Sequence, residues 1–231
     1  MFYKDWKPIY EKIAKDFNFK LEKEKKSAVF LDKLLERKDI LSLERIEKII
    51  NNEEIVVFGA GPSIDKSIVL NRNKIENCVK ISADGATSAL IKNGILPDII
   101  VTDLDGYVPD QIDANSNGSA VIIHAHGDNI SELKKYLLDF NKKILGSTQI
   151  DPQSFKNVYN FGGFTDGDRG VFLSNHFNAK KIFLIGFNFS GKIGKYSFLE
   201  NKDKIQKLKK LDWCKKLIEL LIKNNENIYI L

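Results

Sequence analysis

The stretch PDIIVTDLDG, residues 97–106, places two aspartates directly after an apolar run. Residues 99–101 are typical of a buried strand, and an extended chain directs side chains two positions apart to the same side. Asp103 and Asp105 are therefore expected side by side where this strand ends. Two carboxylates about 4 Å apart repel by roughly 1 kcal/mol in bulk water and about 4 kcal/mol at an effective dielectric constant of 20. Residues 106–109 do not predict a helix for the acids to cap, so the pair indicates bound Mg²⁺, with a solvated turn as the alternative.

Short apolar runs of the same kind alternate with helical patterns through the rest of the chain. Near-continuous apolar strands separated by helices are typical of a mostly parallel sheet with helices on both faces. The expected fold class is therefore α/β, with a sheet that resembles the Rossmann fold. Strands are expected at residues 54–58, 78–83, 98–102, 119–126, 181–187 and 227–231, and helices near residues 63–72, 86–93, 130–140, 168–178 and 201–224.

Residues 1–52 show a different pattern, because their apolar side chains recur at intervals of three and four residues. This spacing predicts amphipathic helices, and no glycine occurs before Gly59. We expect a helical N-terminal segment, residues 1–52, packed beside an α/β domain, residues 53–231, that carries the site.

Composition narrows the class of protein. The 36 basic and 31 acidic side chains give a net charge of +5, which fits a protein that handles phosphates and fits ordinary solubility equally well. No apolar run approaches the ~18 residues of a membrane helix, and the first ten residues do not resemble a signal peptide. Cys78 and Cys214 lack metal-type spacing. We expect a cytoplasmic protein without membrane or nucleic-acid partners, and we interpret the basic runs 20–26 and 204–210 as solvated helix faces.

Polar clusters follow nearly every predicted strand, and ligands of such sheets bind beyond the carboxyl ends of the strands. The first cluster, GAGPS at 59–63, combines a glycine turn with a helix start whose free N–H groups suit a phosphate. Gly59, Gly61 and Ser63 are candidate nucleotide-binding residues on this ground. Ile64 stands where the dinucleotide fingerprint requires a third glycine, so a turn without a ligand is the alternative.

The second cluster, ADGATS at 83–88, places Asp84 at the end of a strand. An acid at this point holds a ribose in dinucleotide-binding proteins, and it is also suited to holding a metal. It is equally able to cap the helix that begins at Ala86, and this motif alone favours the cap.

The fourth strand is followed by HAHGDN at 124–129. The spacing is similar to metal motifs of metallo-β-lactamase-type hydrolases and amidohydrolases, but those sites use more histidines than the three in this chain. We therefore interpret His124 and His126 as hydrogen-bonding groups near phosphate or substrate, with a structural role as the alternative. Asp128 is a candidate metal ligand or a residue that supports one.

The cluster FTDGDRG at 164–170 opens a predicted helix. Thr165 is a candidate helix cap, with Asp168 three residues later as its partner. Asp166 and Asp168 suit a helix N-terminus electrostatically, and metal coordination by one of them is the functional alternative.

Three cations are candidates for phosphate binding. Arg169 offers a planar guanidinium group that matches phosphate oxygens. Lys192 and Lys195 lie in the glycine-containing segment GKIGKYS, residues 191–197, where they are suited to closing over a polyphosphate. An ordinary basic surface loop is the alternative for this segment.

Taken in order, these clusters resemble a known family, the archaeal-type 6-hydroxymethyl-7,8-dihydropterin diphosphokinases, which are similar to thiamine diphosphokinase. The resemblance runs from about residue 55 to residue 197. The motifs that carry it are GAGPS, ADGATSAL, LPDIIVTDLDG, HAHGDN, GFTDGDRG and GFNFSGKIGKYS. One departure is Asn188, where the family pattern leads us to expect an acid.

The resemblance implies Mg²⁺-dependent transfer of diphosphate from ATP to the hydroxymethyl group of the pterin, with release of AMP, on a route to folate or methanopterin-type cofactors. It implies that Mg²⁺ is held by Asp103, Asp105 and the pair Asp166 and Asp168, with Asp84 beside the metal or the pterin. Either Asp84 or Asp128 would accept the proton of the alcohol.

Two further functions stay open from the sequence. A thiamine diphosphokinase is disfavoured because about 34 residues follow Ser197, which leaves no room for the β-sandwich that the thiamine enzymes usually carry. A non-catalytic Rossmann-like nucleotide-binding module is the other. The expected partners are ATP and the pterin, and we also consider a homodimer.

Overall fold

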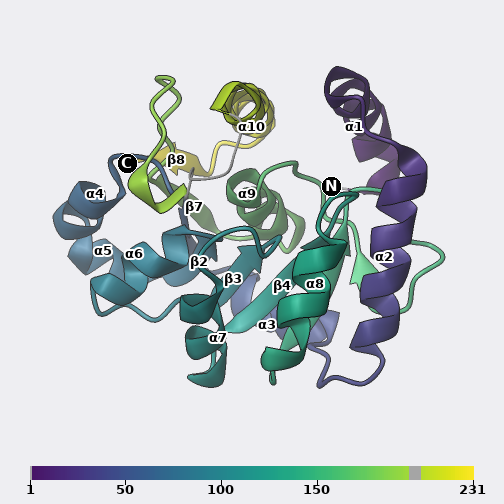
Figure 1. The fold of residues 1–231 in the computed structure, drawn as a ribbon. Helices are drawn as coiled ribbons and strands as arrows, with labels where there is room; N and C mark the ends of the chain where they lie inside the picture. Colours follow the sequence, from purple (N-terminus) through teal and green to yellow (C-terminus); the bar gives the residue numbers. More distant parts are fainter. Residues whose placement is uncertain (1, 198–203) are drawn as a thin grey trace.

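The computed structural model describes residues 2–197 and 204–231, and within these ranges eight strands form one sheet (Figure 1). Every neighbouring pair of strands runs parallel, in the order β6-β5-β4-β3-β2-β1-β7-β8. The α/β fold class is therefore confirmed. The strands are β1 (Glu54–Phe58), β2 (Val79–Ala83), β3 (Ile99–Thr102), β4 (Ala120–Ala125), β5 (Ile144–Thr148), β6 (Val158–Tyr159), β7 (Lys181–Ile185) and β8 (Ile228–Ile230).

The strand order reverses direction at β1. The chain adds β2 to β6 successively on one side of β1 and then returns to place β7 and β8 on the other side. In open α/β sheets, the crevice beyond the carboxyl ends of the strands at such a switch point is where ligands bind. The topology therefore favours a site between the segments that follow β1 and β7.

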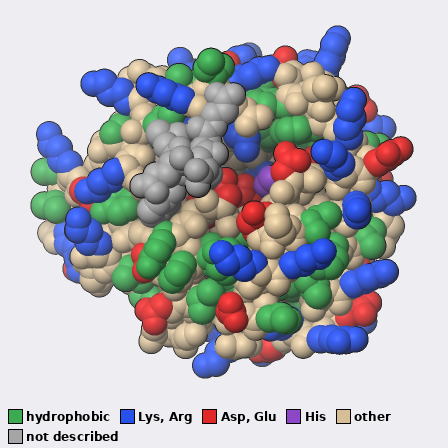
Figure 2. All heavy atoms as spheres, in the orientation of Figure 1, with side chains coloured by type: hydrophobic (Ala, Val, Ile, Leu, Met, Phe, Trp, Pro, Cys, Tyr) green, Lys and Arg blue, Asp and Glu red, His purple; other side chains and the backbone are tan. Residues whose placement is uncertain are grey.

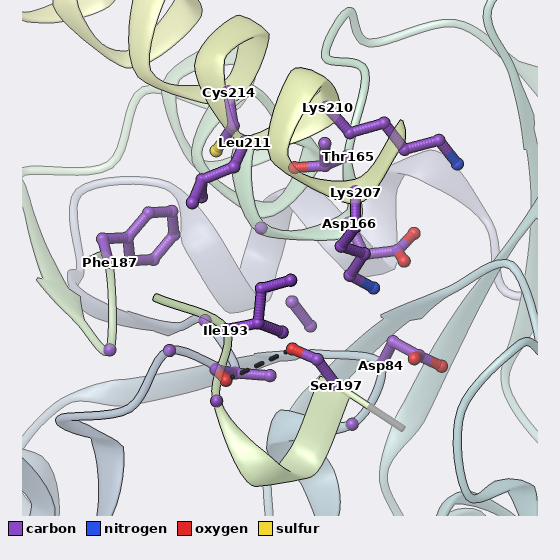
Figure 3. Close-up of a pocket in the computed structure, with 18 of the residues that line it drawn as sticks. Asp84, Thr165, Asp166, Phe187, Ile193, Ser197, Lys207, Lys210, Leu211 and Cys214 are labelled. Carbon is purple, nitrogen blue, oxygen red and sulfur yellow. Dashed lines mark hydrogen bonds between the residues drawn. The ribbon is translucent and has the colours of Figure 1, made fainter. Parts of the chain in front are cut away.

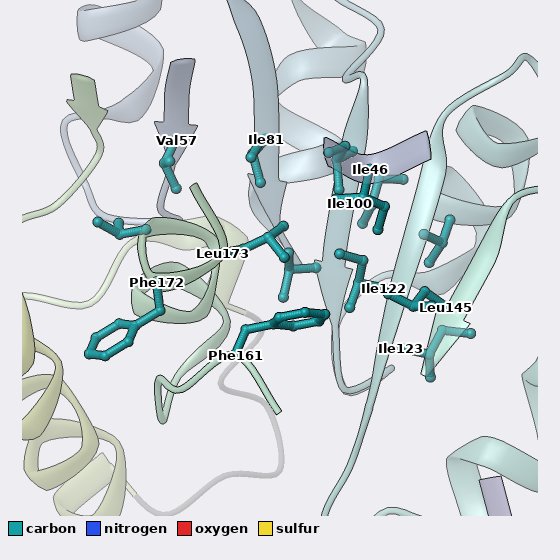
Figure 4. Packing of buried hydrophobic residues seen from close by; sticks show 14 of the residues in the cluster. Ile46, Val57, Ile81, Ile100, Ile122, Ile123, Leu145, Phe161, Phe172 and Leu173 are labelled. Carbon is teal, nitrogen blue, oxygen red and sulfur yellow. The ribbon is translucent and has the colours of Figure 1, made fainter. Parts of the chain in front are cut away.

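Side chains of β1 alternate between two hydrophobic clusters, one on each face of the sheet. Val56 and Phe58 join the cluster with α4 (Ile64–Leu70), α5 (Arg72–Glu76) and α6 (Ala86–Lys92). Ile55 and Val57 join the larger cluster on the opposite face. Helix α9 (Asp166–His176) covers that face, and Figure 4 shows its Leu173 among strand side chains. Burial of both faces explains why the strand is apolar at every position except its first.

The N-terminal helices α1 (Tyr3–Phe17), α2 (Leu21–Leu35) and α3 (Leu43–Ile50) confirm the predicted helical segment. Helices α1 and α2 lie at the opposite side of the molecule from α4, α5 and α6, whereas α3 lies nearer the middle of the view (Figure 1). Their side chains belong to the large cluster, with Trp6 fully buried and its indole N–H donating to the Gln149 carbonyl at 3.0 Å. A boundary between residues 52 and 53 stays a prediction.

Some elements differ from the sequence expectation. Strands β5 and β6 were not predicted, because β5 contains Gly146 and β6 has two residues, so neither has the apolar run of a typical strand. The expectation that residues 106–109 begin no helix is wrong, since α7 (Val108–Ser116) starts there with Pro109 in its first turn. Proline suits that position because its φ angle is preset and its missing N–H has no partner in the helix. The remaining helices are α8 (Ile130–Tyr136) and α10 (Lys204–Asn224), with short 3₁₀ turns η1 (Leu137–Asp139) and η2 (Lys195–Ser197).

Across the described ranges, no helix combines the length and the apolar character that a bilayer crossing requires.

Candidate active site

One pocket lies beyond the carboxyl ends of the central strands, where the strand order reverses. Its empty volume is about 1110 Å³, and this value includes space that is open to solvent. In Figure 2 acidic side chains and a histidine are visible in the middle of the molecular face. The charged lining side chains are Asp84, Asp103, Asp105, His126, Asp166, Arg169, Lys192, Lys207 and Lys210.

Three of the predicted acids come together in this pocket. Asp84, Asp103 and Asp105 each offer a carboxylate oxygen, and the three oxygens lie within 4.8 Å of one another. Asp84 follows β2, whereas the other two follow the neighbouring strand β3. The sequence expectation that these acids lie close together is therefore confirmed.

The backbone brings Asp103 and Asp105 together by a turn, and the expectation of a simple extended chain is wrong in this detail. Leu104 between them has a left-handed conformation, with φ of 67°, which is uncommon for a residue with a side chain. The Asp105 backbone N–H donates to Oδ1 of Asp103 at 3.2 Å. Strained backbone of this kind concentrates at functional sites, where the surrounding structure holds it.

Asp84 is held by three donors that converge on its Oδ1. They are the Thr102 hydroxyl at 2.9 Å, the Gly106 N–H at 3.2 Å and the Gln111 side-chain amide at 2.9 Å. Any Cβ at Gly106 would stand 2.3 Å from this carboxylate, so only glycine fits there. The N-cap of α6 is Gly85, and these three donors hold the Asp84 carboxylate toward β3 and α7, whereas its motif favoured a cap on α6.

Asp103 is fixed from the β4 side of the pocket. Its Oδ2 lies 3.2 Å from Nε2 of His126. Burial is the largest influence and by itself would raise the pKa of Asp103. The hydrogen bond and charge of His126, together with the charges of other nearby cations, hold the pKa well below its ordinary value. The Asn129 amide donates to the carbonyls of Asp103 and His124 at 2.9 and 2.7 Å, which joins the two loops.

Asp166 opens helix α9 and points into the same pocket (Figure 3). Its Oδ1 accepts from the Arg169 guanidinium at 2.9 Å. The pKa of Asp166 is nevertheless raised well above its ordinary value, first by burial and then by the negative charge of Asp103. Asp84 and Asp105 act in the same direction, so the fourth acid is electrostatically part of the cluster.

Asp168 has a different role, which the helix-cap interpretation predicted. Its carboxylate accepts from the N–H groups of Phe164 and Thr165 and from the Thr165 hydroxyl, the last at 2.7 Å. Thr165 is the N-cap of α9 and also lines the pocket. Asp168 is fully buried and does not line the pocket, and burial raises its pKa. The structure therefore separates the predicted metal pair Asp166 and Asp168.

Two candidate site residues of the HAHGDN cluster, His124 and Asp128, lie outside the pocket lining. His124 is 2% exposed, and its Nδ1 lies 3.0 Å from the Ser147 hydroxyl. Burial and then the charge of Arg169 lower the pKa of His124 well below its ordinary value. Asp128 is exposed, and its backbone N–H donates to Nδ1 of His126 at 3.4 Å.

The glycine turn after β1 meets the segment after β7. Gly61 packs so closely that a Cβ would stand 2.3 Å from the Gly186 carbonyl oxygen. The backbone N–H and hydroxyl of Ser63 both donate to Oδ1 of Asn188, at 3.0 and 2.7 Å. Asn188, the departure from the expected family pattern, therefore provides an oxygen that serves both donors. Gly59 and Gly61 line the pocket, but Ser63 does not.

Of the two lysines predicted to bind phosphate, only one lines the pocket, and two other lysines that line it were not predicted. Lys192 lines the pocket, whereas Lys195 makes an ion pair with Asp65 at 2.7 Å. Lys207 and Lys210 of α10 line the pocket, so the interpretation of residues 204–210 as a solvated face is wrong for these two. Their signal was the i, i+3, i+4, i+7 spacing with two apolar residues further along the helix, which defines one helix face.

The apolar part of the pocket also escaped the sequence analysis. It includes Phe187 and Ile193 near Leu211 and Cys214 of α10 (Figure 3). Phe19 and Phe164 line the side nearest the N-terminal helices, with ring centroids 6.2 Å apart. Such surfaces suit flat heterocyclic rings. These residues come from distant parts of the chain, so no local sequence motif predicts that they share a pocket.

Comparisons with known proteins show which family the chain resembles. Three curated archaeal proteins named 6-hydroxymethyl-7,8-dihydropterin pyrophosphokinase are similar to the chain along nearly its whole length. The protein of Methanocaldococcus jannaschii is 43% identical over 94% of this chain and 95% of its own. That of Pyrococcus furiosus is 42% identical over 97% and 96%, and that of Methanothermobacter thermautotrophicus is 40% identical over 96% and 95%.

A solved structure of the MAf glycosyltransferase from Magnetospirillum magneticum aligns with 66% of this chain and 25% of its own, at 19% identity and a TM-score of 0.37. That similarity is too low to support an argument. The sequence profile described as "6-hydroxymethylpterin diphosphokinase MptE-like" matches residues 28–194. With that match and relatives above 40% identity, the chain belongs to the MptE-like family of 6-hydroxymethylpterin diphosphokinases.

Proposed function

We propose that this protein transfers diphosphate from ATP to the hydroxymethyl group of 6-hydroxymethyl-7,8-dihydropterin and releases AMP, with Mg²⁺ as the metal. The observation that carries the proposal is the convergence of Asp84, Asp103 and Asp105 within 4.8 Å, in a pocket that the glycine turn at Gly59 also lines. The names of relatives at 40 to 43% identity support the same acceptor.

The donor set suits the proposed metal. Mg²⁺ prefers oxygen ligands and typically binds one or two carboxylates together with substrate phosphates. Asp84, Asp103 and Asp105 offer carboxylates from two adjacent strand ends, and Asp166 is the nearby candidate for a further ligand. When bound, the ion would neutralise charge on the phosphate oxygens. Asp168 is omitted from the proposed ligands, because its oxygens accept the hydrogen bonds of the α9 cap.

The chain's own residues would position the two substrates. In the reaction, the acceptor oxygen forms a bond to the β-phosphorus of ATP, the bond from that phosphorus to the oxygen of the departing AMP breaks, and the hydroxyl proton is released. Of the two predicted proton acceptors, Asp128 lies outside the pocket lining and Asp84 is a proposed metal ligand, so we assign the proton to neither. Little covalent work falls to the protein in phosphoryl transfer, and positioning and charge neutralisation dominate.

The apolar walls would orient the ring systems. The apolar lining includes Phe187 with Leu211, and Phe19 with Phe164. A site that joins a nucleotide and a pterin needs two places for flat rings with the transferred phosphate between them. Two apolar pairs in one pocket with the carboxylates are consistent with that need.

The proposal is tested by incubating the protein with ATP, Mg²⁺ and one acceptor at a time, and by measuring AMP. We expect AMP with 6-hydroxymethyl-7,8-dihydropterin, none with thiamine, and none after chelation of the metal by EDTA. If AMP forms with thiamine alone, thiamine is the acceptor and the pterin assignment is wrong. If AMP forms with neither acceptor, a non-catalytic nucleotide-binding module is favoured.

A further inference from the structure

One face of α10 forms part of the pocket wall. Lys207, Lys210, Leu211 and Cys214 all line the pocket, and their spacing of i, i+3, i+4 and i+7 places them on a single helix face. The family profile ends at residue 194, so α10 lies beyond the region that it matches. This helix contributes to the site although the family profile does not cover it.

The charges of the pocket lining explain why these lysines matter. The described lining residues include four carboxylates, and four cations face them: Arg169, Lys192, Lys207 and Lys210. Arg169 is already engaged by Asp166 at 2.9 Å. Asp84, Asp103 and Asp105 are the acids suited to a metal. Three lysines therefore remain in the lining for an anion.

Lys207 and Lys210 are both partly buried at the pocket wall. Figure 3 shows them from the same helix on the side of Asp166, while Leu211 and Cys214 lie on the side of Phe187. Within the described ranges, neither ammonium group has a hydrogen bond or an ion pair in the structure. An ammonium group held beside carboxylates without pairing with them is suited to a ligand that lies between the two.

We propose that Lys207 and Lys210 bind the triphosphate of ATP and position it over the carboxylate cluster. This inference rests on the proposed function, and it adds the residues that hold the phosphate donor. Ammonium groups form charge-assisted hydrogen bonds with phosphate oxygens, which are stronger than neutral ones. The change from charged to apolar side chains along the same face directs the phosphates toward Asp166 and a ring toward Phe187.

The test measures binding of Mg²⁺-ATP by calorimetry, without acceptor, for the wild type and for Lys207→Ala and Lys210→Ala. Each variant is expected to bind about tenfold more weakly, since a hydrogen bond to a charged group contributes enough for roughly that factor. With both substrates present, KM for ATP should rise by a similar factor while KM for the pterin stays within about twofold. Lys210→Arg retains the charge and should recover most of the affinity.

Lys223→Ala is the matched control, because Lys223 is exposed on the same helix and lies about 20 Å further along it. Its ATP affinity and the melting temperatures of all unliganded variants should match the wild type. If the wild type binds ATP and forms AMP while the Lys207 and Lys210 variants bind ATP as Lys223→Ala does, the lysine assignment is wrong and the proposed function stands. A wild type that binds no Mg²⁺-ATP overturns both.

Discussion

Two Asp-x-Asp pairs with identical spacing take different structural roles in this molecule. Asp103 and Asp105 flank a left-handed residue at a strand end, and both reach the carboxylate cluster. Asp166 and Asp168 lie in the first turn of α9, where residues two apart do not share a face. Asp166 therefore lines the pocket, while Asp168 holds the helix cap. The backbone conformation between the two aspartates, and not their spacing, decides whether such a pair can share a metal.

Among the variants that test the contrast between the two Asp-x-Asp pairs, Asp105→Asn is expected to lose the most turnover. Removing one charge from the proposed ligands should lower turnover by at least about 10³-fold, since metal stabilisation of developing charge is several kcal/mol and each 1.36 kcal/mol is tenfold. AMP formation measures the loss. The fold should stay intact by circular dichroism. Mg²⁺ is expected to raise the melting temperature of the wild type but not that of this variant. Turnover within tenfold of wild type would contradict the metal assignment.

A smaller loss of activity, about 10²-fold, is expected from Asp166→Asn, because three proposed ligands remain and each tenfold of rate is 1.36 kcal/mol. The change also removes the ion pair with Arg169. AMP formation under saturating substrates is the measurement. The control is Asp128→Asn, an exposed residue outside the pocket lining, which should keep nearly wild-type turnover. If both variants lose the same turnover, the assignment of Asp166 to the site and of Asp128 to the surface outside it is wrong.

Asp168→Ala should act on stability instead of chemistry. The variant leaves donors of Phe164 and Thr165 without their acceptor, and we expect the free energy of unfolding to fall by about 2 to 3 kcal/mol. Urea unfolding measures the change, and turnover well below the melting temperature should stay within about tenfold. A variant of unchanged stability that no longer responds to Mg²⁺ would instead identify Asp168 as a ligand.

The sequence predicted the sheet and the cluster of acids because both follow from short-range patterns. Apolar strands such as residues 54–58 are recognisable by themselves, and parallel strands bring their carboxyl ends to one edge of a sheet. Asp84 and Asp103 therefore belong together before any coordinates are known. The left-handed turn at Leu104 could not be predicted from the sequence, because leucine rarely adopts a positive φ angle.

Other parts of the site depend on contacts between distant segments. The sequence pattern around Lys207 and Lys210 is typical of lysines on a helix surface. Only the position of α10 in the structure shows that both line the pocket. His124 occurs in a motif that looks accessible, but β4 lies inside the sheet and buries it. Asp168 had two competing roles in the sequence, and the hydrogen bonds of Thr165 decide between them.

The smallest and most specific test concerns the pH dependence of stability in the metal-free protein. The pKa of Asp166 in the folded state lies above its ordinary value of 3.8, with burial as the largest cause and the charge of Asp103 next, and the Arg169 ion pair does not offset them. Between pH 3.8 and the raised value, the folded state binds more protons than the unfolded state, so stability falls as pH rises. Asp166→Asn stays neutral and lacks this dependence.

We therefore expect the unfolding free energy of Asp166→Asn to exceed that of the wild type by a margin that is absent below pH 3.8. The margin should grow as pH rises and become constant above the folded-state pKa. Urea unfolding of both proteins across this range, with EDTA present, measures it. A margin that shrinks with rising pH would mean that the Arg169 ion pair dominates at Asp166. The two Asp-x-Asp pairs would then differ in geometry, but Asp166 would no longer share the electrostatics of the acid cluster.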